Sequence, residues 1–345
     1  MKIASINTEQ ETLVVAEIGN NHEGSYALAE ELVGLVAETG AQVVKFQTFQ
    51  TKHFISSSNA ARFERLKGFE LSYSDFERLA AHARRAGLIF MSTPLDLESA
   101  DFLNTLVPAF KIASGDNNYF ELLERICGFK KPIILSTGMS DDHGIARSVE
   151  HILKTSAILG WEPELALLHC VGSYPAPDEQ ANLASIPFLK ARFQTTVGYS
   201  DHTLGIENAL FAVAAGAQIV EKHFTKDKNY SSFRDHQLSA TPSELKELVS
   251  RIKNLERVLG RFEKEIQPCE QSTIPAARRA AVARRDLKAG HVLQKSDFQW
   301  LRAGSLGIAA DREDLILGKT LRSTCIAGDP LTLAHFEVLH SEART

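Results

Sequence analysis

Eight short apolar runs alternate with amphipathic stretches over the first 260 residues of the sequence. The runs are LVVAEIG (13–19), QVVKFQTF (42–49), LIFMSTP (88–94), AFKIAS (109–114), PIILST (132–137), ELALLHC (164–170), TTVGYSD (195–201) and AQIVEKHF (217–224). The stretches between them, such as YALAEELVGLVAETG (26–40) and DFERLAAHARRAG (75–87), repeat apolar residues at helical spacing. Eight strand–helix units predict an α/β chain that closes into a (β/α)8 TIM barrel, with a doubly wound open sheet as the alternative.

The pattern changes after ELKELVSRIKNLERVLG (244–260), which we interpret as the helix that completes the barrel. Residues 263–279 are polar and include two prolines, as expected of a linker. Beyond them, short apolar runs are separated by turn signals such as LKAG and IAGDP. We therefore predict a barrel domain over 1–262, a linker over 263–279 and a small, mostly β domain over 280–345.

Composition argues against several classes of protein. No run of about 18 apolar residues occurs, so no segment is expected to cross a membrane. The four cysteines form no CxxC pair, which argues against a disulfide scaffold or a zinc ribbon and favours a reducing cytoplasm. The net charge of −5 argues against nucleic acid as a partner. Residues 276–345 are nevertheless basic, with 11 Lys and Arg against 8 Asp and Glu, which suits either an anionic ligand or a solvated surface.

Polar side chains gather at the carboxyl ends of the predicted strands, where the active sites of such barrels lie. They are Glu17, Lys45, Gln47, Thr93, Lys111, Ser114, Ser136, Thr137, His169, Ser200, Asp201, His202, Glu221 and His223. A strand buried on both faces should be apolar throughout, because an unpaired buried charge is costly. Each residue alone could be a satisfied structural group, but the whole set predicts a functional site at this end of the barrel.

Two histidines, His202 and His223, end neighbouring predicted strands at matching positions. Imidazole nitrogen is a good ligand for Zn, Mn, Fe or Co. Only two such ligands are evident, which would leave coordination positions open for water and substrate, as in catalytic metal sites. We therefore predict a catalytic metal held by His202 and His223. The alternative is a pair of hydrogen-bonded core histidines.

Two lysines, Lys45 and Lys111, should point into the same end of the barrel. One of them could form a Schiff base with a carbonyl substrate, or both could serve as fixed cations for a phosphate or carboxylate. Ser114 and Ser136 lie near Lys111 in the predicted barrel, and hydroxyl groups beside a lysine fit phosphate binding better than an apolar pocket would. The sequence thus favours the binding of a phosphorylated substrate.

The order of motifs resembles the sialic acid synthase family. The motifs are VVAEIGNNHEGSYALAEELV, VVKFQTF, FKIASGDNN, PIILSTGMS, LLHCVGSYPAP, GYSDHTLG and EKHFT. The C-terminal stretch VARRDLKAGHVLQKSDFQWLRAGSLGI resembles the antifreeze-like (SAF) domain that these enzymes carry. The likeness covers almost the entire chain and supports the barrel over the open sheet.

The resemblance implies a condensation of phosphoenolpyruvate with N-acetylmannosamine or a related acylamino sugar. The products would be a nine-carbon 2-keto-3-deoxy acid and phosphate. It also implies that His202 and His223 hold a divalent cation, Mn²⁺ with Mg²⁺ or Co²⁺ as alternatives, which polarises the sugar aldehyde as a Lewis acid.

The resemblance assigns roles to individual residues. Those matching phosphoenolpyruvate-binding positions are Lys111, Ser114, Ser136 and Ser200. Those matching sugar-binding or catalytic positions are Glu17, Lys45, Gln47, Thr93, Tyr174 and Asp235. Asp116 matches a residue proposed to activate the attacking water. Arg302 matches an arginine that the SAF domain of one subunit inserts into the active site of the other, which implies a domain-swapped homodimer.

Three departures from the family pattern concern the ligands. Gly172 replaces an asparagine that some relatives place near the phosphate, and Phe233 and Arg234 replace the usual Gly-Pro before Asp235. Near the end of the linker, ARRAAV stands where many relatives have RRSL. The substrate therefore stays open among N-acetylmannosamine and the legionaminic, pseudaminic and spore-coat-type sugars.

Two other functions remain as alternatives. Synthases of other keto-deoxy sugar acids act on phosphorylated aldoses, which would require a second phosphate site. A carbohydrate-binding or ice-binding protein on a catalytically inactive barrel is the alternative from another class, but the intact Glu17, Lys111, His202 and His223 argue against it.

Overall fold

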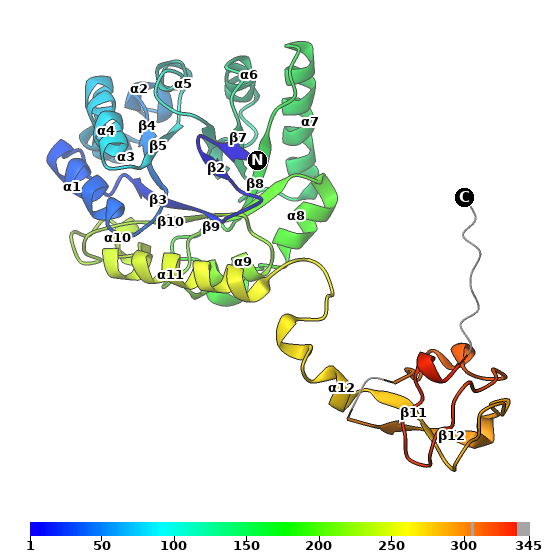
Figure 1. Cartoon of the computed structure of the whole chain (residues 1–345). Helices are drawn as coiled ribbons and strands as arrows, with labels where there is room; N and C mark the ends of the chain where they lie inside the picture. Colours follow the sequence, from blue (N-terminus) through cyan, green and yellow to red (C-terminus); the bar gives the residue numbers. More distant parts are fainter. Residues whose placement is uncertain (305–306, 337–345) are drawn as a thin grey trace. The chain divides into compact units, whose positions relative to one another are not determined.

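The computed structural model describes residues 1–304 and 307–336, and the chain divides into two compact units, Met1–Gly260 and Arg261–Thr345. The parallel sheet of the first unit has eight strands in the order β5-β4-β3-β10-β9-β8-β7-β6. They are β3 (Leu13–Gly19), β4 (Val43–Thr48), β5 (Ile89–Pro94), β6 (Phe110–Ile112), β7 (Ile133–Ser136), β8 (Leu165–Cys170), β9 (Thr196–Asp201) and β10 (Ile219–His223). Because the two end strands, β5 and β6, also lie beside each other, the sheet forms a nearly closed barrel (Figure 1). Every predicted run contains one of these strands, and the predicted α/β barrel is confirmed.

Helices surround the ring of strands (Figure 1). They are α1 (Tyr26–Ala37), α2 (Thr51–Phe54), α3 (Ala60–Phe69), α4 (Tyr73–Arg85), α5 (Leu97–Leu103), α6 (Phe120–Gly128), α7 (Asp142–Ile158), α8 (Ser185–Phe193), α9 (Glu207–Ala214), α10 (Asp235–Leu238) and α11 (Pro242–Leu259). Their buried faces and the outward side chains of the strands form one extensive apolar core. No helix among the described residues is long and apolar enough to cross a membrane.

Local sequence signals explain where two of these helices begin. The Ser72 side chain accepts a hydrogen bond from the backbone N–H of Asp75 and starts α4, while Thr241 does the same with Glu244 and starts α11. In both cases the carboxylate bonds back to the backbone of the capping residue, which completes a capping box. Pro242 occupies the first turn of α11, where its missing N–H costs nothing.

A second apolar cluster fills the inside of the barrel toward the amino ends of the strands. Its members are Ile3, Leu13, Val15, Val43, Met91, Ala109, Ile134, Ala166, Leu168 and Ile219. Ile3 belongs to an N-terminal hairpin, β1 (Lys2–Ile3) and β2 (Ile6–Asn7), that the sequence did not predict. This packing excludes water from the amino end of the barrel interior, so the polar residues of the strands are confined to the carboxyl end.

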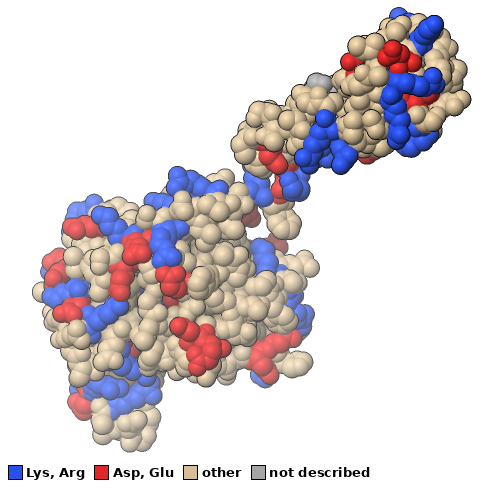
Figure 2. Space-filling model, turned by 90° about the horizontal axis from the view of Figure 1, so that it is seen from below, with Lys and Arg blue, Asp and Glu red and all other residues tan. Residues whose placement is uncertain are grey.

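The second unit has its own core. Strands β11 (Arg279–Ala283) and β12 (Phe298–Arg302) pair antiparallel, and a buried cluster that includes Leu287, Ile316 and Leu331 packs with them. A short helix, α12 (Ile274–Ala277), precedes them. Basic side chains cover more of this smaller body than acidic ones on the face shown in Figure 2. Residues 305–306 and 337–345 of the predicted C-terminal domain lie outside the described residues.

The barrel interior has no room for a side chain at Gly198 of β9. A Cβ atom there would lie 2.4 Å from the carbonyl oxygen of Ile219 and 2.5 Å from a methyl carbon of Leu168. We expect Gly198→Ala to lower the free energy of unfolding by about 1–3 kcal/mol, as overpacking of a core does. Urea denaturation followed by circular dichroism measures this change.

Gly34→Ala is the matched control, because Gly34 lies within α1 and nothing would approach its Cβ within 4 Å. We expect it to raise stability by about 0.5–1 kcal/mol through the higher helix propensity of alanine. Equal effects of the two substitutions would contradict the close approach at Gly198.

Candidate active site

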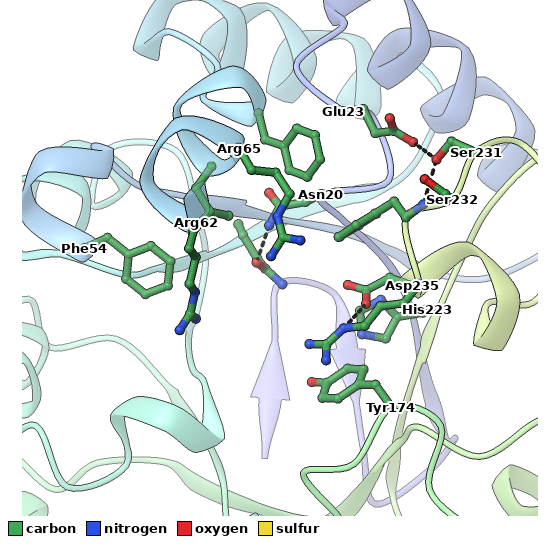
Figure 3. A pocket seen from close by; sticks show the side chains of 15 residues that line it. Asn20, Glu23, Phe54, Arg62, Arg65, Tyr174, His223, Ser231, Ser232 and Asp235 are labelled. Carbon is green, nitrogen blue, oxygen red and sulfur yellow. Dashed lines mark hydrogen bonds and ion pairs between the residues drawn. The ribbon is translucent and has the colours of Figure 1, made fainter. Parts of the chain in front are cut away.

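Two neighbouring cavities lie at the carboxyl ends of the barrel strands. The inner cavity, about 120 Å³, is lined by Glu17, Lys45, Gln47, Thr93, Lys111, Ala113, Ser114, Gly115, Ser136, Met139, Cys170, Gly172, Tyr174, Ser200, His202, Glu221 and His223. The outer cavity, about 800 Å³, is lined by Asn20, Glu23, Gln47, Phe54, Arg62, Arg65, Leu66, Phe69, Tyr174, His223, Ser231, Ser232, Phe233, Arg234 and Asp235 (Figure 3). Gln47, Tyr174 and His223 line both, so the two cavities adjoin. Of the fourteen site residues predicted from the sequence, eleven line the inner cavity and Asp235 lines the outer one.

Four buried charged groups form the floor of the inner cavity. The Lys45 ammonium lies 2.6 Å from Glu17 and 3.6 Å from Glu221, and Lys111 lies 3.3 Å from Glu221. All four side chains are at most 8% exposed. Two cations and two carboxylates thus balance one another in a site that water barely reaches.

Neutral donors and acceptors complete this cluster. The Lys45 ammonium donates to the Thr93 hydroxyl at 3.0 Å, and the Ser200 hydroxyl donates to Glu221 at 3.0 Å. Gln47 donates to Glu17 at 3.0 Å. These residues come from five strands, so the cluster connects β3, β4, β5, β9 and β10.

The cluster sets the pKa values of its members. Burial would raise the pKa of Glu221, but the ammonium groups of Lys111 and Lys45 outweigh this and hold the pKa at about 2. Burial raises the pKa of Glu17, although Lys45 opposes the shift. Burial lowers the pKa of Lys111, whereas for Lys45 the two carboxylates overcome burial and raise the pKa. Glu221 is therefore ionised, and Lys45 keeps its proton.

The two predicted metal-binding histidines lie together, with ring centroids 5.4 Å apart. The Nδ1 of His202 lies 2.9 Å from the carbonyl oxygen of Val171 and must donate to it, which leaves the Nε2 lone pair free. The buried Nδ1 of His223 has no hydrogen-bond partner, and burial holds the pKa of this ring well below its usual value. Burial opposes a rise in the pKa of His202, but its contacts with Cys170 and Val171 outweigh burial and raise it. His223 therefore has a free nitrogen lone pair, and His202 offers one to a metal when its ring is neutral.

The side chains around these rings fit a site with open coordination positions. Within residues 1–304 and 307–336, no group of three or more His, Cys, Asp and Glu side chains is placed to hold a metal ion. The protein would thus supply two imidazole ligands to the metal. Water and substrate would supply the remaining ligands, which is the pattern of a catalytic site. Tyr174 packs its ring against His202 at 4.0 Å and limits the space beside it.

Serine hydroxyl groups border the inner cavity on the side of β6 and β7. Ser114 accepts a hydrogen bond from the backbone N–H of Gly138 at 3.1 Å. The Ser136 hydroxyl is buried and has no hydrogen-bond partner in the protein. A buried polar atom without a partner is costly, so Ser136 is suited to bind a ligand.

Some polar residues at the strand ends are satisfied structural groups instead. Asp201 accepts a hydrogen bond from Lys222 at 2.9 Å, and both side chains are completely buried. The ring of His169 donates to the carbonyl oxygen of Ala181, and Thr137 donates to that of Leu168. These residues hold the ends of β7, β8 and β9 in place, and none of them lines either cavity.

Two predicted residues do not line either cavity. Asp116 lies in the 3₁₀ turn Ser114–Asp116, partly buried, and burial raises its pKa to about 6. Arg302 is the last residue of β12 in the second unit, where it is exposed. The roles of Asp116 and Arg302 stay predictions.

Glu221 was among the polar strand-end residues that predicted the site, but the sequence assigned it no individual role. It precedes His223 by two residues on β10, so the alternation of a strand places both on the inward face. Arg62 and Arg65 of α3 had no such signal, because the long connection between β4 and α4 has no strong period.

Comparison with known proteins identifies the family. A model of the NeuB family matches residues 32–264, and a model of the SAF domain matches residues 278–337. The chain belongs to the NeuB family. The predicted resemblance to sialic acid synthases and to the SAF domain is thereby confirmed, and the chain is a phosphoenolpyruvate-using enzyme of the sialic acid synthase type.

Relatives of this NeuB-family chain are named for different sugar acids. It is 38% identical over 324 residues to N,N'-diacetyllegionaminic acid synthase of Campylobacter jejuni, covering 90% of this chain and 96% of that protein. It is 32% identical over 355 residues to N-acetylneuraminate-9-phosphate synthase of Drosophila melanogaster, covering 92% and 94%. The crystal structure of N-acetylneuraminic acid synthetase from Leptospira borgpetersenii superposes with a TM-score of 0.75 at 32% identity, covering 79% of this chain and 94% of that one.

Two of the three departures from the family pattern lie in the two cavities. At Gly172, an added Cβ would approach the Met139 side chain to 3.0 Å, so Met139 occupies space that an asparagine would need. Phe233 packs edge-on against Phe69 at 5.1 Å, and the Arg234 guanidinium lies over the Tyr174 ring at 4.8 Å. Residues that depart from the family pattern thus shape both cavities.

Removing the charge of Glu221 should destabilise the barrel, because Lys111 would be left buried without a carboxylate. We expect Glu221→Gln to lower the free energy of unfolding by about 3 kcal/mol, the lower end of the cost of breaking a buried ion pair, since Lys111 can release its proton. Urea denaturation at pH 7 measures the loss.

The surface carboxylate of Glu207, which pairs with Arg251, provides the control. We expect Glu207→Gln to have little effect, because solvent screens exposed pairs. A Glu221→Gln variant as stable as this control would contradict the structural importance of the buried cluster.

Proposed function

We propose that the chain condenses phosphoenolpyruvate with N-acetylmannosamine or a related acylamino sugar to give a nine-carbon 2-keto-3-deoxy acid and phosphate. The observation that carries the proposal is the inner cavity, where two lysines and three serine hydroxyl groups lie beside two imidazoles at the carboxyl end of the barrel. Membership of the NeuB family supports it.

The phosphoenolpyruvate end of the site would be formed by Lys111, Ser114, Ser136 and Ser200. Lys111 supplies a positive charge, and the unpartnered hydroxyl of Ser136 supplies a hydrogen bond that the protein does not use. Because these groups are buried, their bonds to an anion would be shorter and stronger than those in water.

The aldehyde end would be formed by His202 and His223 together with Lys45. A divalent cation held by the two rings, Mn²⁺ with Mg²⁺ or Co²⁺ as alternatives, would polarise the carbonyl oxygen of the sugar. Lys45, whose pKa is raised by Glu17 and Glu221 against the effect of burial, stays an ammonium that can donate to the same oxygen. A protonated Lys45 cannot form a Schiff base, which requires a neutral amine.

The reaction would form one C–C bond and break one C–O bond. C3 of phosphoenolpyruvate attacks the aldehyde carbon, and the aldehyde oxygen takes a proton to become a hydroxyl. Water adds to the cationic C2, and the tetrahedral centre expels phosphate by cleavage of its C–O bond, which leaves the ketone. The resemblance assigns the activation of this water to Asp116, which follows Gly115 of the inner cavity in the turn Ser114–Asp116. Burial raises the pKa of Asp116 to about 6, so it would accept a proton near neutral pH if it reaches the water.

The sugar would extend from the inner cavity into the outer one. Gln47, Tyr174 and His223 border both cavities, and Asp235 lines the outer one. Glu17 and Thr93 reach the aldehyde end through their contacts with Lys45. Relatives named for legionaminic acid and for neuraminate 9-phosphate indicate that the sugar differs among family members.

Incubation with phosphoenolpyruvate, Mn²⁺ and a panel of sugars tests the proposal. We expect phosphate and a 2-keto-3-deoxy acid to appear together with an acylamino sugar, and a chelator to abolish turnover until Mn²⁺ is restored. Phosphate release with arabinose 5-phosphate but with no acylamino sugar would contradict the proposal.

The His223→Ala variant should lose about 10²–10³-fold in kcat, as after removal of one group from a preorganised site. The control is His143→Ala, which changes an exposed histidine and should leave kcat unchanged.

We also propose that Arg302 acts across a homodimer, as the resemblance implies. Its exposure on β12 and the basic surface of the second unit support this role. Two inactive variants, His202→Ala and Arg302→Ala, should regain activity when their chains are co-refolded. In a mixed swapped dimer, one site combines an intact His202 with an intact Arg302.

The control is each variant refolded alone, which should stay inactive. A full-length chain that is monomeric by light scattering, or an Arg302→Ala variant with unchanged kcat, would contradict the exchange of Arg302.

A further inference from the structure

A second buried ion pair lies outside both cavities, on the outward face of the barrel strands. The Lys222 ammonium donates to a carboxylate oxygen of Asp201 at 2.9 Å, and both side chains are completely buried. Val220 and Phe224, two residues before and after Lys222, belong to the apolar core between strands and helices. Because side chains alternate along a strand, Lys222 lies in this apolar layer, and neither member of the pair lines a cavity.

The two members of this pair are sequence neighbours of the predicted metal ligands. Lys222 directly precedes His223, and Asp201 directly precedes His202. The same ammonium also donates to the backbone carbonyl oxygen of Thr203 at 2.6 Å. Asp201 accepts hydrogen bonds from the backbone N–H of Thr203 at 2.8 Å and from its hydroxyl at 2.7 Å. The residues on both sides of His202 are thus bound to the residue next to His223.

The pair lies where the backbone pairing of β9 and β10 stops. Asp201 and Lys222 are the last partners in the parallel register of these two strands. The side-chain bonds therefore continue the connection between the strand ends beyond the last pair of the ladder. The two imidazoles follow directly, with ring centroids 5.4 Å apart. Their separation depends on how these strand ends lie relative to each other, which the ion pair fixes.

A shared metal ion is sensitive to the separation of its ligands. The bond between a metal ion and a histidine nitrogen is about 2 Å long, so two nitrogens that share one ion lie within about 4 Å of each other. A functional arrangement of this kind must be held to within about 0.5 Å. A small shift between the ends of β9 and β10 would therefore weaken the binding of the ion.

Stability alone does not explain why two charges are buried at this place. Removing a lysine and an aspartate from water is costly, and well-packed apolar residues in the same space often stabilise a protein as much or more. Hydrogen bonds, however, require a particular distance and direction, which apolar contacts do not. The pair is therefore better suited to fix a position than to add stability.

We propose that Lys222 and Asp201 are positioning residues that set the separation of His202 and His223 and thereby the affinity of the site for a divalent cation. The inference rests on the metal site of the proposed function. It assigns to two residues that touch no substrate a part in holding the metal.

A titration of the metal-free, full-length protein with Mn²⁺ tests the inference, with free Mn²⁺ measured by electron paramagnetic resonance. The variant is the double substitution Asp201→Asn with Lys222→Met. It removes one charge of each sign, so the net charge near the site is unchanged and cannot account for a change in affinity. We expect the Kd for Mn²⁺ to rise by about tenfold or more, as when a group that holds a metal ligand is removed. The urea concentration at the midpoint of unfolding should stay near that of the unmodified chain.

Two further variants separate position from stability. Leu248 is buried in α11 and lines neither cavity, so Leu248→Ala should unfold at a lower urea concentration and bind Mn²⁺ with unchanged affinity. Thr203→Val removes one hydroxyl contact with Asp201 and keeps both charges. It should raise the Kd by a smaller factor than the double substitution, and it decides the question if the double variant does not fold.

The outcomes separate this inference from the proposed function. A folded double variant that binds Mn²⁺ as tightly as the unmodified chain would overturn the positioning role and leave the condensation intact. If the double variant does not fold, an unchanged Kd for Thr203→Val would do the same. An unmodified chain that binds no Mn²⁺ would overturn the metal site and this inference together. An unmodified chain that binds Mn²⁺ but converts no acylamino sugar would contradict the condensation alone.

Discussion

The ion-pair cluster of Glu17, Lys45, Lys111 and Glu221 is the constraint on which the active site depends. Taking four charges out of water is costly, and the cost is offset only because every charge has an opposite partner within 2.6–3.6 Å. Glu221 is central, since it contacts both lysines. The arrangement fixes the mutual positions of four side chains from β3, β4, β6 and β10, so a ligand meets groups that are already oriented.

The apolar cluster at the other end of the barrel interior explains why this charge cluster can exist. Ile3 and the inward residues of the strands exclude water from the amino end, which leaves one open end. Any polar group on an inward face must then find its partners at the carboxyl end. The two histidines, the serines and the charge cluster thus share a small volume, where phosphate and aldehyde chemistry can be joined.

The inner and outer cavities differ in size and in the polar groups that line them. The inner cavity balances its charges internally and leaves a few unpartnered atoms, such as the Ser136 hydroxyl and Nδ1 of His223, for ligands. The outer cavity is larger, and polar, charged and aromatic side chains line it together.

The sequence by itself determined the strands, the order of the domains and most of the inner cavity. Buried parallel strands leave long apolar runs, and an inward polar residue at the end of such a run is conspicuous. The N-terminal hairpin was missed because a strand of two residues is too short to show an alternation of apolar and polar residues. Only the tertiary structure decided that Glu221 joins two lysines, that Asp201 and His169 are structural, and that Arg62 and Arg65 line the outer cavity. These outcomes depend on which side chains meet across distant elements, and local sequence patterns do not encode such contacts.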